Sequence, residues 1–166
     1  IADALRAAAA RPGDVAAIGL AVQRATTVVW ERATGLPLYP AIGWQDSRTQ
    51  PRVAELLAQG IFTNTLASAT KLEWILDQRG AMARAAAGEL CFGTIDSWLL
   101  WQLSGGRAHV TDHSNASCTG LYDFLAGGWD GTVLAAMRLP EAVLPRIVDS
   151  SGVAAQTDAA VFGASV

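Results

Sequence analysis

Three polar stretches interrupt a largely apolar sequence and hold the side chains best suited to chemistry. The first, Gln23-Arg24-Ala25-Thr26, follows the apolar run Val15–Val22, which has the length of a strand. Ligands of open α/β sheets bind beyond the carboxyl ends of strands, and a guanidinium donates several hydrogen bonds in a fixed fork. The stretch is therefore a candidate for binding hydroxyl or phosphate oxygens. An arginine paired with a nearby carboxylate explains the same pattern, and on periodicity alone it is the better explanation.

The second stretch, Trp44–Thr49, places an indole beside the charged groups of Asp46 and Arg48. An aromatic ring can pack against the C–H faces of a polyol while charged groups bind its hydroxyls. An ordinary core tryptophan at a strand end, with Asp46 or Ser47 capping the next helix, explains the same residues, and for this stretch alone it is the better explanation. The third stretch, Thr111–Thr119, either satisfies its own backbone as a turn or lines a cleft.

The amino-acid composition excludes several classes of protein. Of the 166 residues, 51% are hydrophobic and 16% are charged, which excludes general disorder. The net charge of -3 disfavours binding to nucleic acid, which normally needs a basic surface. No apolar run approaches the roughly 20 residues of a membrane span.

Cysteine and histidine usage adds two expectations about compartment and metal binding. The two cysteines are too few for a disulfide framework and indicate a reducing cytoplasm. A zinc site would need Cys91, Cys118, His109 and His113, whose spacing matches no zinc pattern. We therefore expect a cytoplasmic protein without a metal site of its own, in which both histidines lie in a polar loop.

Hydrophobic periodicity predicts helices and strands that alternate along the chain, which is typical of α/β or α+β folds. Continuous apolar residues at Val15–Val22 indicate a strand covered on both faces, and the helix at Thr94–Leu103 is apolar nearly all round, as in a buried helix. The other predicted strands are Thr26–Trp30 and Leu38–Trp44, which would form a hairpin, and Leu90–Phe92. The other predicted helices are Ile1–Ala10, Pro51–Ala58, one that begins at Ser68 with Leu72, Ile75 and Leu76 on one face, Met82–Ala87 and Trp129–Leu139.

Several short blocks in the three stretches and around them agree in order with one known family. The blocks are Gln23-Arg24, Thr26–Trp30, Thr34-Gly35, Pro37–Tyr39, Ala41-Ile42, Trp44–Asp46, Arg48-Thr49, Ser68–Asp77, Phe92–Trp101, His109–Asp112, Ser114–Ser117, Thr119, Trp129-Asp130, Leu144-Pro145 and Ser150–Gly152. Together they cover nearly the whole chain, and they resemble the glycerol kinases of the FGGY carbohydrate kinase family.

This resemblance implies a fold, an activity and a set of site residues. The fold would be α/β, a partial actin/hexokinase-like (ribonuclease-H-like) domain with a mixed sheet and flanking helices. The activity would be transfer of the γ-phosphoryl group of Mg-ATP to a primary hydroxyl of a polyol or sugar. In the family, the arginine that matches Arg24 bonds substrate hydroxyls, and the tryptophan that matches Trp44 forms an apolar wall. We add their neighbours Gln23 and Asp46 as candidate substrate-binding residues.

Two positions depart from the family pattern and bear on the substrate. Ala25 stands where glycerol kinases have a glutamate, and Leu66 stands where they have a tyrosine, so two hydroxyl-binding side chains are missing. Because of these matching positions, Ala25 and Leu66 complete the six candidate substrate-binding residues. The segment between Thr49 and Ser68 is also shorter than in typical members. Glycerol remains the leading substrate. Another polyol or ketose, such as erythritol or xylulose, is the alternative, and a non-catalytic module that keeps the fold is a second alternative.

The resemblance also implies that residues 1–166 are an incomplete N-terminal domain. The family's phosphate-binding turn would precede Ile1, and its catalytic aspartate and C-terminal domain would follow Val166. We therefore expect no catalytic, ATP-binding or Mg²⁺-binding residue in this segment and no activity from it in isolation. A truncated domain should also leave apolar surface or a sheet edge uncovered. The full-length protein is expected to act on a small molecule and to form a homo-oligomer.

Overall fold

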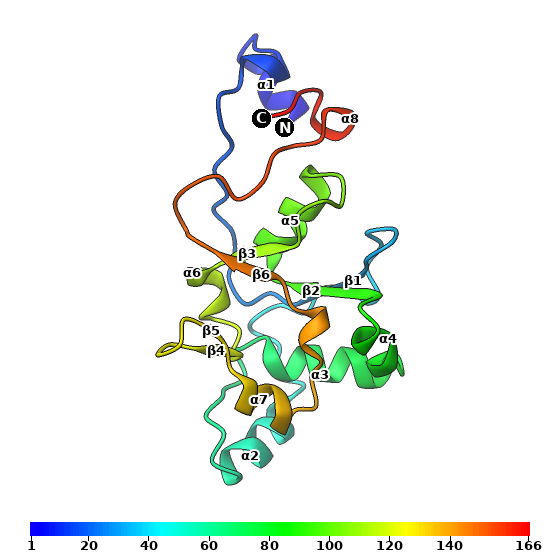
Figure 1. Cartoon of the computed structure of the whole chain (residues 1–166), viewed down its shortest axis with the longest axis vertical. Helices are drawn as coiled ribbons and strands as arrows, with labels where there is room; N and C mark the ends of the chain where they lie inside the picture. Colours follow the sequence, from blue (N-terminus) through cyan, green and yellow to red (C-terminus); the bar gives the residue numbers. More distant parts are fainter.

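The computed structural model describes residues 1–166 as an elongated chain of short helices and strands (Figure 1). Both termini lie at one end, near α1 (Ala2–Ala7) and α8 (Ala159–Phe162), and α2 (Gln50–Ala58) lies at the other end. The remaining helices are α3 (Ala69–Gln78), α4 (Met82–Ala86), α5 (Ile95–Leu103), α6 (His113–Ala116) and α7 (Gly131–Ala136), and short 3-10 turns occur at Pro12–Asp14 and Glu141–Val143. None of these helices has the length and the apolar content needed to cross a membrane.

Strands pair in both directions, within three two-stranded sheets. β1 (Val28–Glu31) pairs antiparallel with β2 (Leu90–Gly93), and β3 (Val110–Asp112) pairs parallel with β6 (Arg146–Val148). β4 (Tyr122–Asp123) and β5 (Gly128–Trp129) form a short hairpin. The mixed α/β character that the resemblance implies is confirmed. The strands form three separate pairs rather than one continuous sheet.

The main hydrophobic core joins β1 and β2 to the helices α2, α3, α4 and α7. Leu72, Ile75 and Leu76 of α3 lie on one helical face and are completely buried, as their spacing predicts. Burying each such side chain contributes roughly 1.5–3 kcal/mol. The core therefore fixes α3 against the sheet, and this position matters for the site described below.

A smaller aromatic cluster lies on the other side of β1 and contains Trp30, Trp101 and His109. The His109 ring stands edge-on to Trp30, 5.3 Å between centroids, and its Nε2 donates to the carbonyl of Phe92 at 2.8 Å. Burial lowers the pKa of His109 to about 4. Of the two histidines predicted in a polar loop, His109 does lie in the loop before β3, but its surroundings are aromatic, and His113 instead begins α6.

Two predicted strands do not form. Residues 16–26 make no backbone–backbone hydrogen bond, and most of Val15–Val22 is exposed. A strand exists only through pairing with a neighbour, and no neighbour pairs with this run. Leu38–Trp44 makes one isolated bridge, between Ile42 and Thr27 just before β1, and a second isolated bridge joins the preceding Pro37 to Trp30 of β1. Prolines 37 and 40 lack the N–H donors that a longer ladder requires, and β1 takes β2 as its partner instead.

The helix α5 is less buried than its composition predicts. Its buried residues are Asp96, Ser97 and Trp101, whereas Leu99 is 36% exposed. Asp96 accepts a hydrogen bond from the hydroxyl of Thr111 at 2.7 Å, so the polar side of the helix faces β3. The prediction of a helix buried all round is wrong, because α5 packs Trp101 into the aromatic cluster and turns Asp96 to β3 while Leu99 faces outward.

Candidate substrate pocket

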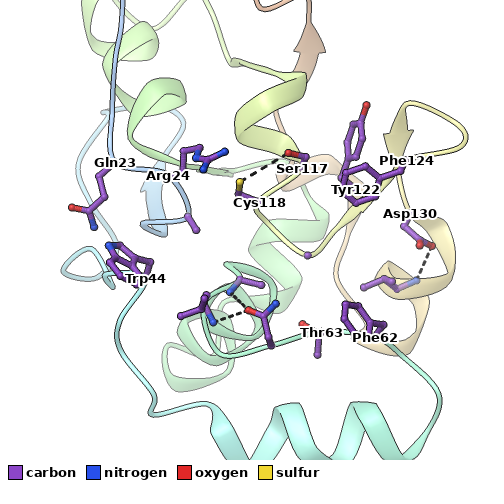
Figure 2. A pocket seen from close by; sticks show the side chains of 16 residues that line it. Gln23, Arg24, Trp44, Phe62, Thr63, Ser117, Cys118, Tyr122, Phe124 and Asp130 are labelled. Atoms are coloured by element: carbon purple, nitrogen blue, oxygen red, sulfur yellow. Dashed lines mark hydrogen bonds between the residues drawn. The ribbon is translucent and has the colours of Figure 1, made fainter.

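A pocket of about 670 Å³ opens where several loops meet above α3 (Figure 2). It brings together five of the six predicted site residues, which come from positions far apart in the chain. Its lining consists of Gln23, Arg24, Ala25, Trp44, Phe62, Thr63, Asn64, Leu66, Ala67, Ser117, Cys118, Gly120, Tyr122, Phe124, Asp130 and Val133. Most of these side chains are apolar, with a small number of polar groups, which is the usual character of a small-molecule site.

Arg24 supplies the free positive charge of the pocket. Its side chain is exposed and makes no ion pair or hydrogen bond within the chain. Figure 2 shows the guanidinium projecting in the direction of Ser117 and Cys118. Its neighbour Gln23 is tied down, since its amide donates to the hydroxyl of Thr26 at 2.8 Å. The guanidinium therefore keeps all its donors for a ligand.

Ala25 makes the sharp turn that presents Arg24. Its φ angle of 59° lies in the left-handed region, which costs a non-glycine residue about 1–2 kcal/mol. Ala25 is buried, and its carbonyl accepts a hydrogen bond from the Ser68 hydroxyl at 3.1 Å. A strained backbone held by a buried hydrogen bond marks a position that the surrounding structure defines tightly.

Trp44 and Leu66 form apolar walls of the pocket. Trp44 is 37% exposed and Leu66 is 51% exposed, so neither is a core residue. The explanation of Trp44 as an ordinary core tryptophan therefore does not hold. An exposed indole in a concave site offers a flat apolar face to the carbon chain of a ligand.

Asp46 lies outside the pocket lining, so its placement differs from that of the other five candidates. Both of its carboxylate oxygens are engaged by the Arg48 guanidinium, at 2.9 Å and 2.7 Å. These hydrogen bonds hold the pKa of Asp46 at about 2. Asp46 does not cap the next helix either, because α2 begins at Gln50 with Thr49 as its N-cap residue.

The structure adds pocket residues that the sequence did not single out. Phe62 and Phe124 are 86% and 75% exposed at the rim, although nothing in their local pattern distinguishes them from surface residues. Thr63 is 5% exposed, and its hydroxyl has no hydrogen-bond partner. Both open alternatives for the stretch Thr111–Thr119 apply in part: Ser117 and Cys118 line the pocket, whereas the Thr119 hydroxyl bonds the backbone of its own turn. The residues before Ser117 form parts of β3 and α6.

Cys118 offers a direct probe of pocket occupancy. It lines the pocket and is partly exposed, whereas Cys91 is buried and burial raises the pKa of its thiol to about 11. Iodoacetamide should therefore alkylate Cys118 first, and a ligand in the pocket should slow this reaction about tenfold or more, because thiolate reactivity requires access. Mass spectrometry of the modified peptides measures both rates, with Cys91 as the internal control. Equal labelling with and without ligand would contradict the placement of the ligand beside Cys118.

Known proteins of one family share both the sequence and the fold of this chain. The model of the FGGY family of carbohydrate kinases, N-terminal domain, matches residues 1–165. The chain is 49% identical to a glycerol kinase of Paracidovorax citrulli, over 93% of this chain and 33% of that protein. It is 48% identical to a glycerol kinase of Methylobacterium nodulans, over 98% of this chain and 35% of that protein.

Solved structures of carbohydrate kinases also share the fold of this chain. A Plasmodium falciparum glycerol kinase with ADP has a TM-score of 0.82 and 30% identity, over 88% of this chain and 31% of that chain. A xyloylose kinase from Brucella ovis has a TM-score of 0.81 and 27% identity, over 99% of this chain and 35% of that chain. The chain spans about a third of the length of the relatives it matches. Because the family model matches almost every residue, the chain belongs to the FGGY family of carbohydrate kinases.

Proposed function

We propose that these residues form the substrate-binding wall of an ATP-dependent polyol kinase that resembles glycerol kinase. The reaction is transfer of the ATP γ-phosphoryl group to a primary hydroxyl, with glycerol giving glycerol 3-phosphate. One observation carries the proposal: the unpaired guanidinium of Arg24 and the exposed indole of Trp44 line the same pocket.

The pocket residues have different roles in binding a polyol. Arg24 donates hydrogen bonds to substrate hydroxyls, and Trp44 packs against the C–H face of the carbon chain. Gln23 supports the turn before Ala25 through its bond to Thr26. Phosphoryl transfer depends mostly on positioning and electrostatic stabilisation, so this wall serves the reaction by fixing the accepting hydroxyl in place.

We assign the catalytic residues and the binding sites for ATP and Mg²⁺ to the parts of the full-length protein outside residues 1–166. ATP and Mg²⁺ are its proposed cofactors. This chain holds no group of three or more His, Cys, Asp or Glu side chains arranged to bind a metal, so no residue here is assigned to Mg²⁺. We further propose a cytoplasmic location and a homo-oligomeric full-length enzyme, and we propose that residues 1–166 alone do not turn over substrate.

A polyol or ketose larger than glycerol is the second candidate substrate. Ala25 and Leu66 supply no hydroxyl-binding group, and the pocket of about 670 Å³ has room for a longer chain such as erythritol or xylulose. A site that lacks a hydrogen-bonding partner loses much of its discrimination for the corresponding hydroxyl. The structure of the pocket therefore favours a broader substrate range than that of a dedicated glycerol site.

A substrate panel on the full-length protein tests these proposals. We expect ATP-dependent phosphorylation of glycerol, with four- and five-carbon substrates competing. The double variant Ala25→Glu/Leu66→Tyr should raise the preference for glycerol about tenfold or more, because it adds hydrogen-bonding groups to the pocket. Leu125→Tyr, at a fully exposed position outside the lining, is the matched control.

The panel also separates the alternatives. Glycerol turnover orders of magnitude above every longer substrate would exclude the larger polyol or ketose. No turnover of any polyol or ketose would contradict the kinase proposal and favour a non-catalytic module. ADP release by residues 1–166 alone would contradict the proposal that this segment is inactive.

A further inference from the structure

Lys71 is the only lysine of the chain, and it is completely buried in the first turn of α3. Its ammonium group forms no ion pair. Nζ donates instead to two backbone carbonyls, that of Trp44 at 3.1 Å and that of Leu66 at 3.3 Å. Burying a charged group without a counter-ion is costly, so the fold must gain something from this arrangement.

The two accepting carbonyls belong to residues that line the candidate pocket. Trp44 and Leu66 lie 22 positions apart in the chain, in loops without regular structure. Backbone atoms in such loops have no helix or strand hydrogen bonds to fix them. Asn64 holds the Leu66 loop locally, by accepting from the N–H of Leu66 at 2.9 Å, and the Lys71 amino group is what bonds this loop to the Trp44 loop.

Neighbouring residues in the same turn reach other pocket loops. The Ser68 hydroxyl donates to the carbonyl of Ala25 at 3.1 Å, and the backbone N–H of Ala69 donates to the carbonyl of Thr119 at 2.8 Å. Thr70 shares a hydrogen bond of 2.8 Å with Thr49. The four residues 68–71 are all buried, and each bonds a different part of the pocket surroundings.

The surroundings of Lys71 do not favour the other two roles of a buried ammonium group, which are to form an ion pair and to bind the ligand directly. The acidic group whose charge acts on Lys71 is Asp46, and both oxygens of Asp46 are already held by Arg48. Burial lowers the pKa of Lys71, and the field of Asp46 opposes that shift. The group is also shielded from solvent, so it does not contact a ligand directly. The hydrogen bonds of its amino group go to the two walls alone.

We propose that Lys71 is a positioning residue, which holds Trp44 and Leu66 at the separation that the substrate requires. The proposal rests on the proposed function of the pocket. Hydrogen bonds from a buried donor to loop carbonyls restrict the motion of the loops. Without these bonds, Trp44 and Leu66 would be held less firmly and the polyol would bind less well, whereas the site for ATP would be unchanged.

Hydrogen exchange and kinetics on the full-length protein test this role. Lys71→Met keeps the length of the side chain and removes its donors. We expect amide exchange in residues 44–48 and 64–67 to accelerate about tenfold or more, and KM for the polyol to rise about tenfold, with KM for ATP unchanged. Leu76→Ala is the control, because it creates a cavity in the same helix without contacting a pocket wall.

The outcomes separate the positioning role from general stability and from the kinase proposal. If Leu76→Ala accelerates exchange in the same two segments as much as Lys71→Met, Lys71 has only a structural role. If Lys71→Met exchanges like the wild type there, the proposal is wrong. Should Lys71→Met not fold, Lys71→Gln carries the same test with a shorter, uncharged donor. A wild-type protein that phosphorylates no polyol contradicts the proposed function, and the exchange data still decide whether Lys71 holds the two walls.

Discussion

Replacing Arg24 with alanine should lower kcat/KM for the proposed polyol substrate about 10- to 100-fold in the full-length protein, which corresponds to one or more lost charged hydrogen bonds. The guanidinium makes no hydrogen bond or ion pair within the chain, so its removal breaks no polar interaction of the fold. The free energy of unfolding should therefore remain within about 0.5 kcal/mol of the wild-type value. Steady-state kinetics with varied polyol, together with urea denaturation, measures both quantities.

A matched control separates the site from general charge effects. Arg79→Ala removes an exposed arginine at the C-terminal end of α3, outside the pocket lining. It should leave kcat/KM unchanged. An Arg24→Ala variant that keeps wild-type kcat/KM, or an Arg79→Ala variant that loses as much, would contradict the role of Arg24 in binding the substrate.

A large loss of stability is expected from replacing Arg52. This residue of α2 binds Glu73 of α3 with two hydrogen bonds, from Nε to Oε2 at 2.7 Å and from Nη2 to Oε1 at 2.9 Å. Glu73 is only 4% exposed, so Arg52→Met leaves a buried carboxylate without its partner. Such a change costs about 3–5 kcal/mol when the pair is fully buried. Because Arg52 is 27% exposed, we expect the lower end, about 3 kcal/mol.

An exposed ion pair provides the comparison for Arg52. Arg6 pairs with Asp3 on α1, where both side chains are more than three-quarters exposed. Arg6→Met should change the free energy of unfolding by less than about 1 kcal/mol. Urea denaturation of both variants measures the difference. Similar small losses in the two variants would show that the Arg52–Glu73 pair does not hold α2 against α3.

Local sequence patterns predicted the helices of the core well. Leu72, Ile75 and Leu76 recur at helical spacing, and they are buried on the expected face of α3. The short strand β2 was also predicted close to its observed bounds. These elements depend on residues near one another in the chain, so their pattern can be detected without knowledge of the fold.

Features that depend on distant partners could not be predicted in the same way. Val15–Val22 has the composition of a buried strand, yet it remains unpaired because strand formation requires a neighbouring backbone. His109 becomes part of an aromatic cluster only when Trp30 and Trp101 come together around it. Composition describes what a segment can form, and the fold decides whether its partner is present.

The residues of the candidate site could likewise be predicted only in part. Arg24 and Trp44 were identified by the chemistry of their side chains and by the family resemblance, and the fold places both in the pocket lining. Asp46 was grouped with them because it is near in sequence, but Arg48 holds its carboxylate outside the lining. Phe62 and Phe124 could not be identified, since an isolated phenylalanine carries no signal of where it lies on a surface.

A crystal structure of the full-length protein with a bound polyol tests the central claim most directly. The account predicts that the guanidinium of Arg24 lies within hydrogen-bond distance of the substrate hydroxyls and that the Trp44 indole lies against the carbon chain. A polyol that is turned over by the enzyme but binds with neither residue in contact would contradict it.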